Sequence, residues 1–213
     1  MVLKTPNPQE TIVFYDKETT GFPDWKQPSD GLDQPHIVQL AAIKCDPVSR
    51  EPLASIDLII RPDGWVIPED ATAIHGITNE QAQRFGVSEG LAIRMLLDFC
   101  HGSLRVAHNR TFDQRIGRIA AKRFLCDEKI ERWARKDDHE CTMVASKSIP
   151  GIGGSSLPHV YQFLTGEELE NAHTAMGDAI GCMHVYWGIQ DYHRGVLTEA
   201  EEHSAQVMND RRP

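Results

Sequence analysis

The most informative stretch of this chain is residues 12–21, IVFYDKETTG, in which four apolar residues lead into two carboxylates, two threonines and a glycine. β-branched and aromatic residues favour a strand, and on a strand Asp16 and Glu18 point to the same face. Two acids at the end of a buried strand repel each other and are costly to desolvate, so a cation commonly holds them there. The stretch therefore predicts half of a divalent metal site, although a solvated strand end explains these residues alone equally well.

Composition sets the broad class. With 213 residues, 40% hydrophobic and 25% charged, the chain is typical of a globular protein, and we expect one domain over residues 1–195 and a polar C-terminal tail over 196–213. Since no segment approaches the roughly 18 apolar residues of a membrane span, we expect a cytoplasmic protein without membrane association. The five cysteines are widely separated and lack a Cys-x-x-Cys pair, which favours free buried thiols over disulfides or a zinc site.

The charge distribution is uneven. A formal net charge of -9 argues against a protein that coats a nucleic-acid backbone by bulk electrostatics, but leaves nucleic acid open as a substrate. Of the 22 lysines and arginines, 9 lie within residues 110–136. Because Arg115, Arg118 and Lys122 follow helical spacing, a solvated helix face is the favoured interpretation, with phosphate steering as the alternative.

Hydrophobic patterns predict an α/β domain around a central sheet. Strands are expected at residues 12–16, 36–43, 53–61, 104–107 and 140–144, the first three as an antiparallel meander. Helices are expected from Thr78 and Ser88 and over 112–125, 156–164 and 172–192. Residues 22–35 form a long loop, for which a plain surface excursion is favoured over a cover for the site or a base-stacking role for Trp25.

Two further segments contain acids that a metal site would need. Asp113 lies in the first turn of the helix after the strand at 104–107, and His173 and Asp178 open the last long helix. Helix capping explains each of them singly. Together with Asp16 and Glu18 they lie at strand ends and helix starts, where an α/β sheet gathers its ligands. Four carboxylates and a histidine suit two Mg²⁺ or Mn²⁺ ions and a base, the equipment for attack of water on a phosphodiester.

Three motifs occur in a fixed order, DKETTG at 16–21, HNRTFD at 108–113 and HTAMGD at 173–178, with a subsidiary IHGIT at 74–78. The arrangement resembles the DEDDh branch of the DnaQ-like 3′-to-5′ exonucleases, over about residues 11–190. The resemblance implies an RNase H-like fold, a three-layer α/β/α domain with a central mixed five-stranded sheet. One departure is Gln39, which stands where many relatives carry glutamate in the second strand.

The resemblance also implies roles for individual residues. Two divalent cations, Mg²⁺ or Mn²⁺, would be held by Asp16, Glu18, Asp113 and Asp178. His173 would act as the general base that deprotonates the attacking water. The substrate contacts that it implies are Thr19 and Phe112 at the terminal nucleotide, His75 near the 3′ end, and Asn109, which also suits a role in shaping its turn.

The expected activity is a metal-dependent 3′-to-5′ exonuclease that releases nucleoside 5′-monophosphates from DNA. DNA is favoured because the first motif and IHGIT look most like the proofreading type. The alternatives are a 3′-to-5′ exoribonuclease acting on RNA or short oligonucleotides, because the motifs act on the phosphodiester and do not choose between sugars, and a polymerase-associated accessory or binding module with the same fold.

Overall fold

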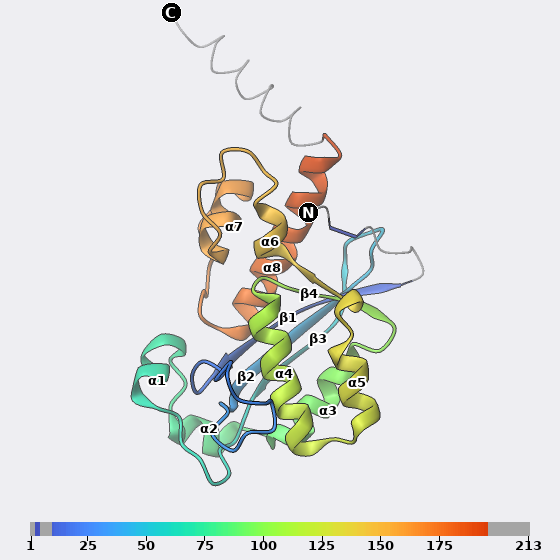
Figure 1. The fold of residues 1–213 in the computed structure, drawn as a ribbon. Helices are drawn as coiled ribbons and strands as arrows, with labels where there is room; N and C mark the ends of the chain where they lie inside the picture. The colour runs from blue at the N-terminus through green and yellow to red at the C-terminus, as the bar shows by residue number, and fades with distance from the viewer. Residues whose placement is uncertain (1–2, 5–9, 196–213) are drawn as a thin grey trace, which may run out of the picture.

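The computed structural model describes residues 3–4 and 10–195, so the tail expected over 196–213 lies outside the described residues. Its centre is a five-stranded sheet in the order β3-β2-β1-β4-β5 (Figure 1). The strands are β1 (Thr11–Thr19), β2 (Ile37–Cys45), β3 (Pro52–Ile59), β4 (Ser103–Ala107) and β5 (His139–Cys141). β1, β2 and β3 form an antiparallel meander, whereas β4 is parallel to β1 and β5 to β4. The mixed five-stranded sheet predicted from the sequence is confirmed.

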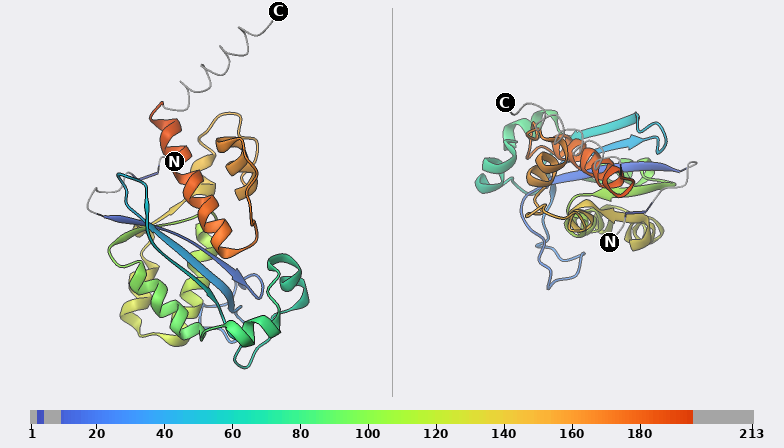
Figure 2. Two further views of the ribbon diagram at one scale, coloured as in Figure 1. Left: turned by 180° about the vertical axis from the view of Figure 1, so that it is seen from behind. Right: turned by 90° about the horizontal axis from the view of Figure 1, so that it is seen from above.

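The two faces of β1 face different helices. Ile12 and Phe14 belong to a core shared with α8 (Ala175–His193), α7 (Leu157–Thr165) and α6 (Thr142–Ser146). Val13 and Tyr15 belong to a second core shared with α3 (Glu89–Phe99), α4 (Arg110–Phe124) and α5 (Asp127–Ala134). The sheet therefore lies between two helical layers, as Figure 2 shows from behind and from above. This is the expected α/β/α arrangement, and it follows from the period-2 alternation of a strand buried on both faces.

Two short helices, α1 (Glu69–His75) and α2 (Asn79–Phe85), pack a third, small core with Val38 of β2. The helix predicted from Thr78 is α2, and the Thr78 side chain forms a capping box with Gln81. Likewise the Ser88 side chain accepts a hydrogen bond from the Leu91 N–H at the start of α3. Helix starts signalled by capping residues are therefore confirmed at both positions.

Several local predictions were wrong. β5 ends at Cys141 and α6 begins at once, where a strand had been expected over 140–144. α8 begins at Ala175 rather than at residue 172, because Asn171 and His173 have φ of 54° and 65° and cannot continue a right-handed helix. The sequence patterns did not predict α1 or α5. In α5 the apolar contacts to the core come from Ile130 and Trp133, too few to give a clear helical period.

The cysteine prediction holds for four of the five residues. Within the described part of the chain all five cysteines are free, and four of them are buried, but Cys126 is exposed at the start of α5. Among the described residues no helix is long and apolar enough to cross a membrane.

The basic face of α4 is not a solvated helix face, which corrects the interpretation favoured from the sequence. Arg115 donates to the carbonyl of Gln27 at 2.5 Å, and Arg123 donates to the carbonyls of Pro35, at 2.8 Å, and Gln34. Two more side chains reach the same loop, Arg118 to Ser29 at 3.1 Å and Lys122 to Asp30 at 3.1 Å. Four cations of α4 therefore hold the long connection between β1 and β2, residues 22–35, which we call the anchored loop.

The anchored loop is also ordered from within. The buried side chain of Gln34 accepts a hydrogen bond from the Asp24 N–H at 3.1 Å and donates to the carbonyls of Asp24, at 2.9 Å, and Pro28, at 3.0 Å. One amide thus satisfies backbone groups that lie outside any strand or helix. The loop therefore has a defined conformation and is hydrogen-bonded to α4, which the plain surface excursion favoured from the sequence did not anticipate.

Candidate metal centre

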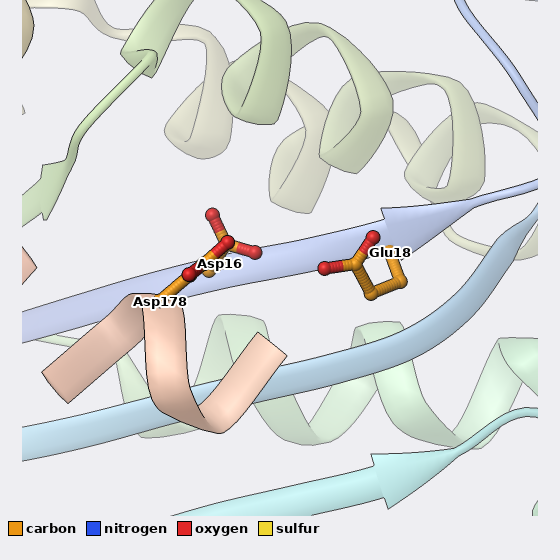
Figure 3. A group of neighbouring side chains, drawn as sticks. All are labelled: Asp16, Glu18 and Asp178. Carbon is orange, nitrogen blue, oxygen red and sulfur yellow. The ribbon is translucent and has the colours of Figure 1, made fainter. Parts of the chain in front are cut away.

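Three carboxylates meet beside the C-terminal half of β1. One oxygen each of Asp16, Glu18 and Asp178 lies within 4.8 Å of the others (Figure 3). The pairing of β1 with β4 runs only to Phe14 and Val106, whereas β1 continues alongside β2 to Thr19. The acids therefore lie where β1 extends beyond its parallel neighbour, at the place where strand direction changes across the sheet. Such a position is a usual site for ligands in α/β folds.

The electrostatics of the cluster favour a bound cation. Burial, followed by the charges of Asp113, Asp178 and Glu18, raises the pKa of Asp16 well above its ordinary value. Burial and the charges of Asp178 and Asp113 raise the pKa of Glu18 to about 7. Burial also raises the pKa of Asp178, opposed by a backbone hydrogen bond and the charge from His173. Carboxylates this close together repel one another, and a cation between them relieves the repulsion. Carboxylate oxygens are also the ligands that Mg²⁺ and Mn²⁺ prefer.

Asp113 lies apart from that group of three, in the first turn of α4 and 2% exposed. Its Oδ1 has no hydrogen-bond partner within the described part of the chain, and lies 3.7 Å from the Nζ of Lys17. Burial raises the pKa of Asp113 to about 6, while Lys17 lowers it. The charge of Asp113 in turn raises the pKa of Asp16 and of Glu18, so Asp113 lies near the cluster. Its buried Oδ1 is available to a further cation.

His173 stands next to Asp178 in a tight turn before α8. The Thr174 hydroxyl caps the helix by accepting from the Gly177 N–H at 3.1 Å, and it donates to the Asn171 carbonyl at 2.8 Å. A Cβ at Gly177 would lie 2.2 Å from that same carbonyl oxygen, so the turn requires glycine there. His173 is exposed, which leaves its ring accessible to water.

Gln39 holds the start of α8 in place. Its buried side chain accepts a hydrogen bond from the Ala175 N–H at 3.0 Å and donates to Asp57 Oδ1 at 2.8 Å. Gln39 also lies directly opposite Glu18 in the β1–β2 register. The sequence marked Gln39 only as a departure from relatives and missed this role. Gln39 lies opposite Glu18 and contacts the start of the helix that carries Asp178 only because of the register of β1 against β2. The hydrophobic pattern of the sequence did not determine that register.

The residues expected to contact substrate occupy different surroundings. Thr19 donates to the Gly21 carbonyl at 2.8 Å and so shapes the turn that ends β1. Phe112 meets Phe22 edge to face, with ring centroids 5.8 Å apart, and Phe22 is 85% exposed. Phe22 was not singled out from the sequence, although an apolar residue directly after the DKETTG motif was a signal.

The other two residues expected to contact substrate, Asn109 and His75, form hydrogen bonds to the backbone. Asn109 is the N-cap residue of α4, and its carbonyl accepts hydrogen bonds from the N–H groups of Phe112 and Asp113, so it shapes the turn that places Asp113. His75 is buried, and its Nδ1 accepts from the Ile77 N–H at 3.1 Å. The contact that the resemblance implies between His75 and a 3′ end stays a prediction.

Comparison with known proteins supports the fold. Among solved structures, similar ones include E. coli Exonuclease I in complex with a dT13 oligonucleotide (TM-score 0.71, 21% identity, covering 90% of this chain and 43% of that chain). Another is a second Exonuclease I structure (TM-score 0.68, 22% identity, covering 86% of this chain and 41% of that chain). A third is a moderately thermophilic Exonuclease I from Methylocaldum szegediense (TM-score 0.65, 21% identity, covering 86% of this chain and 40% of that chain). This chain thus spans less than half the length of these proteins. No curated protein matches it by sequence.

The α/β/α fold and the acidic cluster at the end of β1 place the protein in the class of DnaQ-like, RNase H-like nuclease folds of the DEDDh type. More narrowly, a sequence model described as "Exonuclease" (RNase_T) matches residues 13–186. The chain belongs to this exonuclease family.

Proposed function

We propose that this protein is a 3′-to-5′ exonuclease that hydrolyses the terminal phosphodiester bond of DNA, releases nucleoside 5′-monophosphates and uses two divalent cations. The observation that carries the proposal is the convergence of Asp16, Glu18 and Asp178 within 4.8 Å, with His173 beside Asp178. Membership of the exonuclease family supports the reaction class.

The donor set assigns roles to the four acids. Asp16, Glu18 and Asp178 would hold one ion, and the free oxygen of Asp113 together with Asp16 would hold the second. Bound Mg²⁺ or Mn²⁺ supplies positive charge that stabilises the transition state of phosphodiester hydrolysis. His173, open to solvent, takes the proton of the attacking water.

Exposed aromatic surface supports a single-stranded end as the substrate. Phe22 packs against Phe112 and leaves most of its ring in solvent, beside the turn that ends β1. Aromatic faces of this kind stack on unpaired bases. The similar Exonuclease I structure with a dT13 oligonucleotide favours DNA over RNA.

The test is a time course in Mg²⁺ on 5′-labelled DNA and RNA oligomers of one sequence, each single-stranded, paired and mismatched at the 3′ end. The proposal expects mononucleotides from the 3′ end, fastest from single-stranded DNA. Faster release from RNA would instead establish the exoribonuclease. If no substrate yields mononucleotides with Mg²⁺ or Mn²⁺, the proposal fails and the accessory module becomes the better hypothesis. Co-purification of a polymerase with the tagged chain then tests that hypothesis.

A further inference from the structure

A buried lysine lies between the two acids of β1. Because side chains alternate along the strand, Asp16 and Glu18 face α8 and Lys17 faces α4. The Lys17 side chain is 0% exposed, and its Nζ donates to the Asp113 carbonyl at 3.1 Å and lies 3.7 Å from Asp113 Oδ1. The same Nζ is 4.2 Å from the centroid of the Tyr15 ring.

These surroundings suit an ammonium ion. A ring face, here supplemented by that of Trp133 at 5.4 Å, attracts a cation. The carboxylate that it meets, Asp113, is itself buried, and its Oδ1 lacks a hydrogen bond within the described residues. A buried carboxylate needs a partner charge. Lys17 supplies one from the side of the sheet opposite the three-acid group.

Lys17 changes the net formal charge of the metal centre. The four carboxylates carry four negative charges, which one divalent ion and Lys17 reduce to one. A second divalent ion would leave an excess of one positive charge, and the single negative charge of a phosphodiester cancels it. Without Lys17, two divalent ions neutralise the four acids with no substrate present.

We propose that Lys17 is a positioning residue that acts as a fixed counter-ion for Asp113, so that the substrate-free protein binds one divalent ion tightly and takes the second only together with the phosphate of the substrate. This inference rests on the metal centre of the proposed function. It adds that the affinity for the second ion is set by a residue that does not coordinate it.

The test counts Mn²⁺ bound per chain by isothermal titration calorimetry, without nucleic acid. Wild type is expected to bind one ion tightly. The variant Lys17→Met, similar in length but uncharged, is expected to bind a second ion about tenfold more tightly than wild type, within the range usual for coupling between sites. The matched control is Lys44→Met on β2, because Lys44 lies on the same face opposite Val13 and over the Phe99 ring at 4.8 Å. The control should bind Mn²⁺ as wild type does.

The double variant Lys17→Met/Asp113→Asn guards against loss of folding, since removing both charges leaves no uncompensated one. It is expected to fold and to bind one ion. Equal second-site affinity in wild type and Lys17→Met, or two tight ions in the double variant, would overturn the inference. If Lys17→Met does not fold without metal, rescue of its thermal transition by Mn²⁺ supports the inference, and failure of Mn²⁺ to rescue it counts against the inference. Because no measurement uses nucleic acid, these results are independent of whether the protein proves to be an exonuclease.

Discussion

The side-chain oxygen of Gln39 accepts the N–H of Ala175 at 3.0 Å, which ties the middle strand of the meander to the first residue of α8. Asp178 lies one turn further along that helix. The position of one acid of the cluster therefore depends on an amide group in strand β2.

Replacing this amide tests the dependence. Gln39→Leu leaves the Ala175 N–H buried without an acceptor, and we expect a loss of about 1–3 kcal/mol in the free energy of unfolding, measured by urea denaturation. Mn²⁺ affinity should fall as well, because the start of α8 is released. Asp57→Asn is the control, since Asp57 is exposed and only its contact with Gln39 is altered. Unchanged stability and Mn²⁺ affinity in Gln39→Leu would show that α8 is positioned by other contacts.

The turn before α8 is sensitive to a single methyl group. In Gly177→Ala the new Cβ would meet the Asn171 carbonyl oxygen at 2.2 Å, so the turn that presents His173 must move. A displacement of about 1 Å at a reacting group can cost roughly 100-fold in rate, and we expect a loss of about 10- to 100-fold in single-turnover nucleotide release. Gly188→Ala, further along α8, meets only the Leu164 side chain and should retain activity. Equal rates in the two variants would contradict this account of the turn.

His173 is predicted to act as the base. Removing it in His173→Ala should lower nucleotide release by about 10²- to 10⁴-fold, the usual contribution of a general base. Mn²⁺ binding should be little changed, because His173 is not one of the three clustered ligands. The control is His184→Ala, because His184 is an exposed histidine on α8 that contacts Tyr161. A His173→Ala enzyme with nearly normal turnover would remove the residue from the mechanism.

The metal-free protein should become less stable as pH rises. The pKa of Glu18 is raised from 4.5 to about 7, so between these values the folded state binds more protons than the unfolded state does. The stabilisation is fully present below about pH 4.5 and is lost as pH rises through about 7. In EDTA we expect Glu18→Gln to flatten the fall of the thermal transition temperature across this range. With saturating Mg²⁺ the wild-type dependence should reverse, since the ion binds the deprotonated acids. Identical EDTA profiles for the two proteins would rule out Glu18 as the source.

The conformation of the anchored loop should depend on the hydrogen bonds that Arg123 donates to it. Arg123→Ala removes donors to the Pro35 and Gln34 carbonyls, and we expect trypsin to cut faster after Lys26, together with a loss of about 1.5–3 kcal/mol in stability. Lys122→Ala removes only the pair with exposed Asp30 and should leave the free energy of unfolding nearly unchanged, because solvent screens such a pair. Equal cleavage rates in the two variants would mean that the loop is held by its internal Gln34 contacts alone.

The sequence predicted the sheet, most of the helices and the three acids that converge beside β1, because their signals are local. β-branched and aromatic residues marked β1, capping residues marked α2 and α3, and three acidic motifs marked the cluster. What the sequence did not predict arises from contacts between distant segments. The basic residues of α4 follow helical spacing whether they face water or the anchored loop, and the role of Gln39 appears only when β2 is set against α8. Asp113 was expected in the same cluster, and the structure places it apart from the three converging acids, paired with Lys17.

The alternation of β1 also protects the fold against mispairing. A slip of one residue against β2 would exchange the two faces, turning Lys17 towards Asp178 and Asp16 and Glu18 towards the apolar core around Trp133. Burying a carboxylate in these apolar surroundings costs free energy. The three adjacent charges of β1 thus disfavour a misaligned strand, in which Asp16 and Glu18 would no longer meet Asp178.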